Sequence, residues 1–484
     1  MNDWKKVKLS KVLKQYRIEH WVQDDKSYKQ VTISKYDGVV YRGEKKGIEI
    51  GRKRQFIIDL DKYPNTLLFV RQGLEDGGIG LAPKEVNKCI ATENMPMFSV
   101  EGIETEYLNI FLKSEVFKGQ DRALETTGSA QKSIHERQLL ELEIPLPSVV
   151  EQKELIKKFK TTEEKYFIII SELTTQQTLL TQLRQSILQE AVQGKLVGSW
   201  QLAVGSGRVG FSPGTLGTSR DTVQCPTKSP ESQEKPPTAA ELLKRIKAEK
   251  EKLIKQGKLK KEKPLPPIAE NEIPYPLPEG WVWCRLGEVC SKIGSGSTPR
   301  GGRAVYKNDG FIFLRSQNVQ NEGLDLSNVA YIDYATHKKM SGTKVVANDI
   351  LLNITGGSIG RCALIPNDFI EANVSQHVTI IRLIPLLNYS FFHNFILSPY
   401  FQDKIMEVQT GGNREGLAKK NMELMLVPLP PLPEQKRIVE KVNQLMQHCH
   451  ELEQQVQQST THAQQLMQAV LREVFEKKEE VANV

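Results

Sequence analysis

The sequence predicts an α+β fold in which two similar α+β domains are separated by two long helices that form an antiparallel intramolecular coiled coil. Three observations predict this arrangement: a segment that occurs twice at a long spacing, a heptad pattern that follows each copy, and short strand patterns that precede each copy. The length of 484 residues fits about three domains. Two repeated units and a linker would account for it.

The repeated segment is the clearest signal of duplication. Residues 144–153, IPLPSVVEQK, return as residues 427–436, VPLPPLPEQK, at an offset of 283 residues. Further identities at this offset follow in the next stretch, where Leu183 matches Leu466 and Glu190 matches Glu473. Because solenoid repeats recur about every 20 to 50 residues, a period this long indicates a duplicated domain.

Short apolar runs between turn signals predict strands in both halves. Such runs are rich in β-branched and aromatic residues and are interrupted by Asp-Gly and Gly-Gly pairs. In the first half we expect strands at 30–33, 38–41, 56–59 and 66–69 and a polar helix at 104–118. In the second half we expect strands at 310–314, 349–353 and 377–381 and a helical stretch at 389–408.

Each copy of the repeated segment is followed by two seven-residue series offset by four residues, the pattern of the a and d positions of a coiled coil. The first helix has Leu155, Thr162, Ile169, Gln176 and Leu183 in one series and Phe159, Tyr166, Leu173, Leu180 and Ile187 in the other. The second has Ile438, Leu445, Leu452, Ser459 and Leu466, and Val442, Cys449, Val456, Ala463 and Val470.

The helix starts and lengths follow from the same region. Ser148 and Glu151 have the spacing of a capping box, and Pro433 fits the first turn of the second helix. Each helix should run about 43 residues, or roughly 65 Å. Because both apolar seams belong to one chain, high effective concentration favours pairing between them. Dimerisation of the whole protein through these helices remains the alternative.

The central linker has two parts with different compositions. Residues 198–237 are rich in Gly, Ser, Pro and Thr and predict a flexible segment. Its GSGRVG at 205–210 lacks the preceding strand and following helix that a dinucleotide-binding loop needs. A basic helix is expected at about 239–262. Its lysines form either a solvated face or an arm that faces phosphates or a partner.

Composition and absent motifs exclude several classes. The six cysteines are scattered without zinc or disulfide spacing, which predicts no metal site. The absence of a leader-like segment or a run of 18 apolar residues predicts a cytoplasmic protein without membrane contact. A net charge of +8 permits a polyanionic partner. No amino-methyltransferase motif, phosphate loop or HExxH occurs, so no catalytic residue and no cofactor are predicted in this chain.

The polar residues that remain suit nucleic-acid recognition. Arg, Gln and Asn make the bidentate contacts that distinguish guanine and adenine edges, and Lys and Arg contact phosphates. Two glycine-rich stretches, 77–80 and 356–360, are either phosphate-contacting turns or ordinary tight turns. The candidate DNA-binding residues are Arg42, Lys45, Lys46, Arg52, Arg54, Gln131, Lys132, Ser295, Thr298, Arg300, Arg315, Gln317, Asn318, Asn413 and Arg414.

Several of these segments together resemble the specificity subunit of type I restriction-modification enzymes. They are FLRSQN at 313–318, QHVTII at 376–381, LPEGWVW at 277–283, and the doubled PLPxxxEQK. The resemblance covers nearly the whole chain except about 198–237. This sequence departs from the family in that long Gly/Ser/Pro-rich piece, and its first half lacks a clear counterpart of residues 315–318.

The resemblance implies two target recognition domains, at 1–147 and 276–430, with a long helix at 148–197 and another at 431–478, and a linker at 198–275. Each domain would read one half of a bipartite site in double-stranded DNA, and the helices would set the spacing. The helices would also dock two modification subunits and, through them, restriction subunits. S-adenosylmethionine and ATP would bind those partners. Competing hypotheses are a stand-alone DNA methyltransferase or nuclease, and a coiled-coil scaffold with no DNA role.

Overall fold

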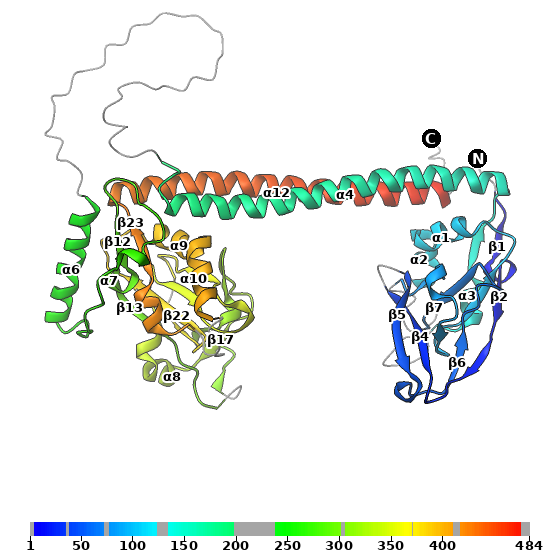
Figure 1. The fold of residues 1–484 in the computed structure, drawn as a ribbon, viewed down its shortest axis with the longest axis horizontal. Coiled ribbons are helices and arrows are strands. Elements are labelled where there is room, and N and C mark those ends of the chain that lie inside the picture. Colours follow the sequence, from blue (N-terminus) through cyan, green and yellow to red (C-terminus); the bar gives the residue numbers. More distant parts are fainter. Residues whose placement is uncertain are drawn as a thin grey trace, which may run out of the picture. The chain divides into compact units, whose positions relative to one another are not determined.

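The computed structural model describes residues 4–34, 38–71, 77–122, 134–197, 238–301, 305–369, 371–409 and 417–475. The chain forms two compact units (Figure 1): unit 1 contains Met1–Gln176 and Gln455–Val484, and unit 2 contains Gln177–Gln454. Both units mix helices with strands, as the sequence predicted. The two longest helices, α4 (Val149–Val192) and α12 (Leu432–Phe475), contribute residues to both.

Unit 1 is built on three sheets with the strand orders β1-β11, β2-β10-β7-β8 and β3-β6-β9-β4-β5. The strands expected at 30–33, 38–41 and 66–69 are confirmed within β4, β5 and β7, and the one expected at 56–59 overlaps β6, which ends at Ile57. The strands are β1 (Lys6–Lys8), β2 (Leu13–Tyr16), β3 (Glu19–Trp21), β4 (Ser27–Ser34), β5 (Gly38–Lys46), β6 (Arg54–Ile57), β7 (Thr66–Phe69), β8 (Ile79–Leu81), β9 (Ile90–Ala91), β10 (Met97–Val100) and β11 (Glu143–Pro145).

The single polar helix expected at 104–118 is wrong in two respects. The segment forms two helices, α1 (Thr105–Lys113) and α2 (Glu115–Arg122), followed later by α3 (Glu136–Glu141). Ser114 separates α1 from α2, because its Oγ donates to Phe111 O at 2.7 Å and accepts from Phe117 N at 3.3 Å. Helix α1 is also apolar on its buried face, where Phe111 packs against Phe475 of α12.

Unit 2 contains two four-stranded sheets, β13-β22-β19-β20 and β17-β14-β21-β18, and two pairs, β12-β23 and β15-β16. The expected strands are confirmed within β14, β19 and β22, and the helical stretch at 389–408 divides into α9 and α10. The elements are β12 (Val282–Arg285), α7 (Leu286–Val289), β13 (Cys290–Ser295), β14 (Phe311–Leu314), β15 (Val319–Gln320), β16 (Gly323–Leu324), β17 (Ala330–Ile332), α8 (Tyr334–Lys339), β18 (Lys344–Val345), β19 (Ile350–Asn353), β20 (Cys362–Leu364), β21 (Ala372–Val374), β22 (Val378–Leu383), α9 (Tyr389–Leu397), α10 (Pro399–Gln409), α11 (Lys419–Leu424) and β23 (Leu426–Leu429).

Helices α4 and α12 contact each other within each unit. In unit 1, Lys158 near the start of α4 pairs with Glu473 near the end of α12 at 2.9 Å. In unit 2, Arg184 near the end of α4 pairs with Glu453 of α12 at 2.7 Å. The capping box predicted at the start of α4 is confirmed, since the Ser148 backbone N–H donates to Glu151 at 2.8 Å.

One of the two predicted heptad series is largely buried in the structure, and the other is displaced at several positions although its Ile438 is buried. Leu173, Leu180 and Ile187 of α4 are at most 9% exposed. Ile169 and Leu183, however, are 44% and 45% exposed, whereas the next residues, Ile170 and Arg184, are half-buried. Helix α12 shows the same displacement, because Leu452 and Leu466 are exposed and Glu453 and Met467 are half-buried. Ile169 and Ile170 lie three and four residues after Tyr166, so both flank the helix face that carries Tyr166. The spacing along the sequence alone therefore does not decide which of the two is buried.

Residues 238–275, which the sequence assigns to the linker, pack on unit 2. Helix α6 (Ala239–Lys255) buries Leu242 and Ile246 in the core of that unit. Lys250 donates to Gly287 O at 2.6 Å, and Lys247 pairs with Glu288 at 2.8 Å. The helix is shorter than the expected 239–262, and part of its basic surface is engaged with the domain.

Arg285 fastens the extended chain that follows α6. This side chain is 3% exposed, and its guanidinium donates to Pro266 O at 2.8 Å, Pro267 O at 3.1 Å and Leu424 O at 2.8 Å. It also pairs with Glu272 at 2.9 Å. A buried guanidinium is tolerated when each of its donors has an acceptor, and the proline carbonyls provide such acceptors here.

Candidate nucleic-acid interface

Strand ends from both large sheets of unit 2 converge on one side of the unit. Strand β22 pairs antiparallel with β13 and β19, so β22 begins where β13 and β19 end. Strands β14 and β21 run parallel and end together. Hydrogen bonds join the two groups, including Ser297 N to Val374 O at 3.2 Å and Asn353 Nδ2 to Ser316 O at 2.8 Å. We call the residues next to these strand ends the polar edge. It comprises residues 295–300, 315–318, 353–358 and 375–377.

Gly296 allows the backbone strands to approach closely at the polar edge. A Cβ at this position would lie 1.9 Å from Val374 O and 2.5 Å from Ser375 O, which no side-chain-bearing residue could accept. The chain can therefore turn here and carry three of the sequence-predicted residues along the edge. These residues, Ser295, Thr298 and Arg300, are all exposed.

Three neighbouring candidates after β14 have different surroundings. Gln317 is exposed, so its amide is free to meet a partner. Arg315 is half-buried and donates to Asn328 O at 2.9 Å. Asn318 is 1% exposed, and its amide donates to Asp325 O at 3.0 Å and Asn328 O at 2.9 Å. The prediction that Asn318 contacts DNA is therefore not supported, because its donors already hold the loop.

The polar edge also contains residues that were not predicted as site residues. Thr355 Oγ1 lies 2.6 Å from His377 Nδ1 at the junction of β19 and β22. Gln376 and His377 are exposed beside them. Asn353 donates to Ser316 O at 2.8 Å, which ties the end of β19 to the loop after β14. The signal that could have found them is a polar residue directly after or before a buried apolar strand.

The glycine-rich stretches are turns in the structure. Gly356–Ser358 forms one turn of 3-10 helix, with Gly356 at φ +73°, and Gly360 has φ +85°. In unit 1, Gly77 has φ +84° and Ile79–Leu81 form strand β8. The tight-turn interpretation is thus sufficient for both stretches, since glycine is favoured at positive φ.

The basic cluster of unit 1 divides into two groups. Arg42, Lys45 and Lys46 are exposed on β5, one arm of the hairpin that β5 forms with β4. Arg52 instead faces Glu93 at 3.7 Å, and Arg54 pairs with Glu19. The hydrogen bond that Arg54 donates to Glu19 raises the pKa of Arg54. The β5 group therefore presents the more available positive charge, and the other group is partly neutralised.

Four candidates, Gln131, Lys132, Asn413 and Arg414, lie outside the described residues. The structure describes the chain again from Ile134 and from Leu417. Ile134 N donates to Arg71 O at 2.9 Å, just beyond β7, and Leu417 N donates to Ile354 O at 3.0 Å, just beyond β19. Each returning segment therefore joins its unit at the end of a central strand of the four-stranded sheet.

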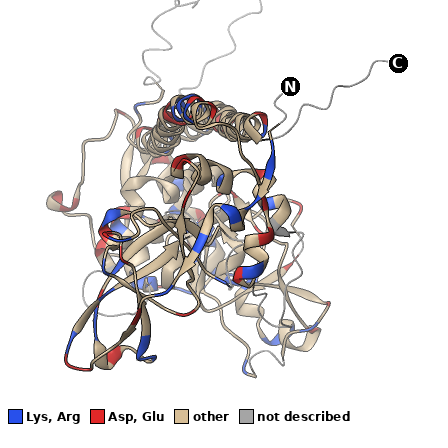
Figure 2. Cartoon of the chain, turned by 90° about the vertical axis from the view of Figure 1, so that its right-hand side faces the viewer, with Lys and Arg blue, Asp and Glu red and all other residues tan. Residues whose placement is uncertain are grey.

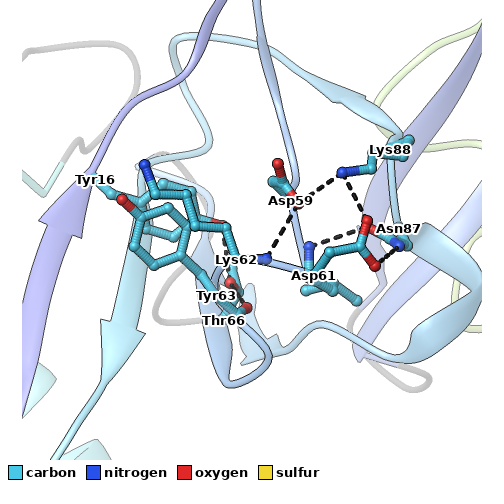
Figure 3. A network of polar contacts seen from close by, with 9 residues as sticks. Tyr16, Asp59, Asp61, Lys62, Tyr63, Thr66, Asn87 and Lys88 are labelled. Atoms are coloured by element: carbon cyan, nitrogen blue, oxygen red, sulfur yellow. Dashed lines mark hydrogen bonds and ion pairs between the residues drawn. The ribbon is translucent and has the colours of Figure 1, made fainter.

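A polar network supports the loops next to the sheets of unit 1 (Figure 3). Lys88, at φ 60°, donates to Asp59 at 2.6 Å and pairs with Asp61 at 2.8 Å. These hydrogen bonds lower the pKa of both carboxyl groups and raise the pKa of Lys88. Asn87 adds a bond to Asp61 at 3.0 Å. The network fixes the turn between β6 and β7.

The distribution of charged and metal-binding side chains in the described part of the chain indicates no further site. Figure 2 shows Lys and Arg interspersed with Asp and Glu on helices and strands alike. Among the described residues, no group of three or more His, Cys, Asp or Glu side chains could hold a metal ion. No helix in the described part of the chain is long and apolar enough to cross a membrane.

Comparisons with known proteins agree on one family. A family model described as the type I restriction modification DNA specificity domain matches residues 278–461. The EcoAI specificity subunit of Escherichia coli, a type I restriction enzyme subunit, is 27% identical over 408 residues, which cover 81% of this chain and 66% of that protein. This chain is similar to the specificity subunits of type I restriction enzymes. The matched region takes in the large sheets of unit 2 and much of α12.

Further comparisons extend the likeness to both halves of this chain. The EcoEI specificity subunit of Escherichia coli is 24% identical over 425 residues, covering 82% of this chain and 67% of that protein. The alignments thus span about two thirds of the length of these two relatives. A solved structure described as the basis of complex assembly and conformational transition of the type I R-M system shares the fold, with a TM-score of 0.66, 16% identity and 99% coverage of both chains.

Proposed function

We propose that this chain binds double-stranded DNA sequence-specifically as the specificity subunit of a type I restriction-modification complex. The polar edge of unit 2 is the observation that carries the proposal. It lies inside the matched specificity region and contains exposed Gln317, Gln376 and His377 as well as exposed Ser295 and Arg300. Such side chains can bond base edges, while the positive side chains position the protein on phosphates.

Unit 1 would read the other half of a bipartite site. Its four-stranded sheet has the order β2-β10-β7-β8, and the corresponding sheet of unit 2 has the order β13-β22-β19-β20. In each sheet the strand that comes first in the sequence pairs with the one that comes last, and the last pairs with the strand that forms a hairpin with its neighbour. This common order supports a duplicated recognition domain. The exposed cations of β5 are its proposed phosphate contacts, and Arg52 and Arg54 contribute less because acids face them.

The repeated EQK segment supports this duplication through its hydrogen bonds. In unit 1, buried Gln152 accepts from Glu104 N at 2.8 Å and donates to Pro147 O at 2.9 Å. In unit 2, buried Gln435 accepts from Asn388 N at 3.0 Å and donates to Pro430 O at 2.9 Å. The glutamine thus ties the start of each long helix to the first residues of a domain helix.

We propose that α4 and α12 pair as an antiparallel intramolecular coiled coil that sets the spacing between the half-sites. The ion pairs of Lys158 with Glu473 and of Arg184 with Glu453 support this pairing, since the partner on α12 comes earlier in the sequence as the residue on α4 comes later. In such a reader, protein geometry is converted into half-site spacing.

The outer faces of these helices are proposed to dock two modification subunits and, through them, restriction subunits. Helix α4 exposes Phe167 and Ile168 at 62% and 69%, and such apolar residues suit burial by a partner. S-adenosylmethionine and ATP would bind those subunits, and this chain would be non-catalytic. A stand-alone methyltransferase or nuclease and a DNA-independent scaffold are the competing functions.

A gel-shift experiment over a salt series tests the proposal with the full chain and genomic fragments. A DNA reader should bind fragments that carry its site in preference to competitor DNA and should weaken steeply as salt rises. A scaffold should bind no DNA at any salt. Methyl transfer by the purified chain without partners would favour the enzyme hypothesis instead.

A further inference from the structure

A cavity of about 390 Å³ opens beside the start of α12 in unit 2. It is enclosed by α6, the turn before β19, the chain leading into α9, and the first turns of α12. Its polar lining includes Arg245 of α6, Lys436 of α12, and Asn348, Asn388 and Ser390. None of the described residues that line it is acidic. The cavity is therefore positively charged and lies away from the polar edge residues.

The two cations of this cavity have no acidic partner in the described part of the chain. Asp349, which follows the lining residue Asn348, is fully buried and already accepts two bonds from Arg382, at 2.7 and 2.8 Å. The side chain of Asn388 accepts from Phe391 N at 3.1 Å and caps α9. The start of α9 adds the positive end of a helix dipole to the charge of Arg245 and Lys436.

The equivalent place in unit 1 contains a carboxylate. Lys153, the lysine of the first EQK, lies 3.6 Å from Glu104, which precedes α1. Lys436 is the lysine of the second EQK, and Asn388 takes the place of Glu104, because both donate a backbone N–H to the glutamine of the segment. Unit 1 thus neutralises its lysine internally. Unit 2 has a neutral amide there and adds Arg245.

We propose that this cavity binds a carboxylate side chain from an acidic segment of a partner protein. The carboxylate would take the role that Glu104 has in unit 1, and a guanidinium with an ammonium beside it suits such a charge-assisted contact. The proposed contact of the carboxylate with this cavity does not require DNA binding. Free phosphate and a nucleic-acid phosphate are the alternative anions, and the test separates them.

The test uses fluorescence anisotropy of a labelled tetraglutamate peptide with the full chain at low ionic strength. We expect the Arg245→Gln/Lys436→Gln double variant to bind at least about tenfold more weakly, the equivalent of losing one charge-assisted hydrogen bond. Asn388→Asp should weaken binding similarly while keeping the cap of α9, since it supplies the missing carboxylate in place. The matched control, Lys153→Gln, should bind like the wild type because Glu104 already occupies that site.

Three outcomes would overturn the proposal. One is the absence of peptide binding by the wild type. Another is equal binding by the wild type and the double variant, which would place the peptide elsewhere on the basic chain. The third is displacement of the peptide by inorganic phosphate, or by a short DNA duplex, at much lower concentration than by acetate. Circular dichroism of each variant confirms that the fold is kept.

Discussion

Gln317 and Arg315, two nearby candidates for DNA contact, differ in how far their side chains are available to bind a base. Gln317 is exposed at the polar edge, whereas Arg315 is bonded to Asn328 O at 2.9 Å. A substitution of Arg315 would remove a possible base contact and also release the loop that carries it. Gln317 gives the cleaner test of base reading.

Gln317→Ala is predicted to relax base preference at one or two positions of one half-site by about 1 to 3 kcal/mol, because a bidentate amide contact would be lost. Binding selection from a randomised DNA library measures this preference. Arg315→Ala should relax it by a similar amount and also reduce stability. Glu322→Ala, in the exposed turn between β15 and β16, is the control. Unchanged preference in Gln317→Ala would remove this residue from the interface.

The Lys88 network predicts a defined pH dependence of stability. Lys88 lowers the pKa of Asp59 and Asp61 below their usual 3.8, so their contribution is present above that value and is lost as pH falls through the folded-state pKa. The two carboxylates raise the pKa of Lys88 above 10.5, so its contribution is complete below that value and is lost as pH rises further. The network therefore stabilises unit 1 between these limits.

Lys88→Gln should lower the thermal unfolding midpoint at neutral pH, and the difference from the wild type should shrink once the carboxyl groups are protonated in acid. Melting followed by circular dichroism from pH 7 to about 3 checks this. Glutamine keeps the Cβ, so strain from the positive φ of residue 88 is the same in both proteins. Lys84→Gln is the control. A difference that stays constant with pH would contradict the ion-pair explanation.

At the scale of elements, the starts of α4 and α12 are stabilised in the same way. Gln152 and Gln435 are 1% and 0% exposed, and each joins a proline carbonyl to the first backbone N–H of a domain helix. A buried amide with two partners rigidly orients one element on another. The glutamine of the repeated segment thus fixes the start of a long helix on a domain helix in each unit.

Gln152→Ala and Gln435→Ala should each lower the free energy of unfolding by about 1 to 3 kcal/mol, because each leaves a buried N–H and a buried carbonyl without a partner. Urea unfolding followed by circular dichroism measures both. Gln457→Ala, on an exposed position of α12, should change stability little. If only one of the two variants were destabilised, the two helix starts would not be equivalent.

At the scale of the whole molecule, the proposed coiled coil makes a geometric prediction. Removing residues 171–177 from α4 and the facing residues 457–463 from α12 keeps the heptads in phase. The recognised site should then shorten by about 10 Å, the rise of seven helical residues, or about three base pairs. Methylation mapping or binding selection reports the spacing. The deletion in α4 alone should disrupt the pairing of the two helices. An unchanged half-site spacing in the double deletion would contradict the proposal that the helices set this spacing.

The sequence by itself determined the features that depend on neighbours along the chain. The doubled EQK segment, the capping box at Ser148 and the buried series through Leu173 and Leu180 are local patterns, and each has the expected structure. The strands at 66–69 and 350–353 followed from their apolar runs in the same way. Local periodicity is encoded in a few successive residues, so no distant contact is needed to read it.

Only the tertiary structure decided which polar side chains are exposed to a partner and which are buried in contacts within the chain. Asn318 and Gln317 are neighbours in a polar loop, but the carbonyls of Asp325 and Asn328 bury one and leave the other exposed. Ile170 of α4 is half-buried and its neighbour Ile169 is exposed, although the heptad pattern predicts the reverse. Arg245 and Lys436 meet at one cavity from segments far apart in the sequence. Burial and charge pairing are set by contacts between such segments, and a one-dimensional pattern does not contain them.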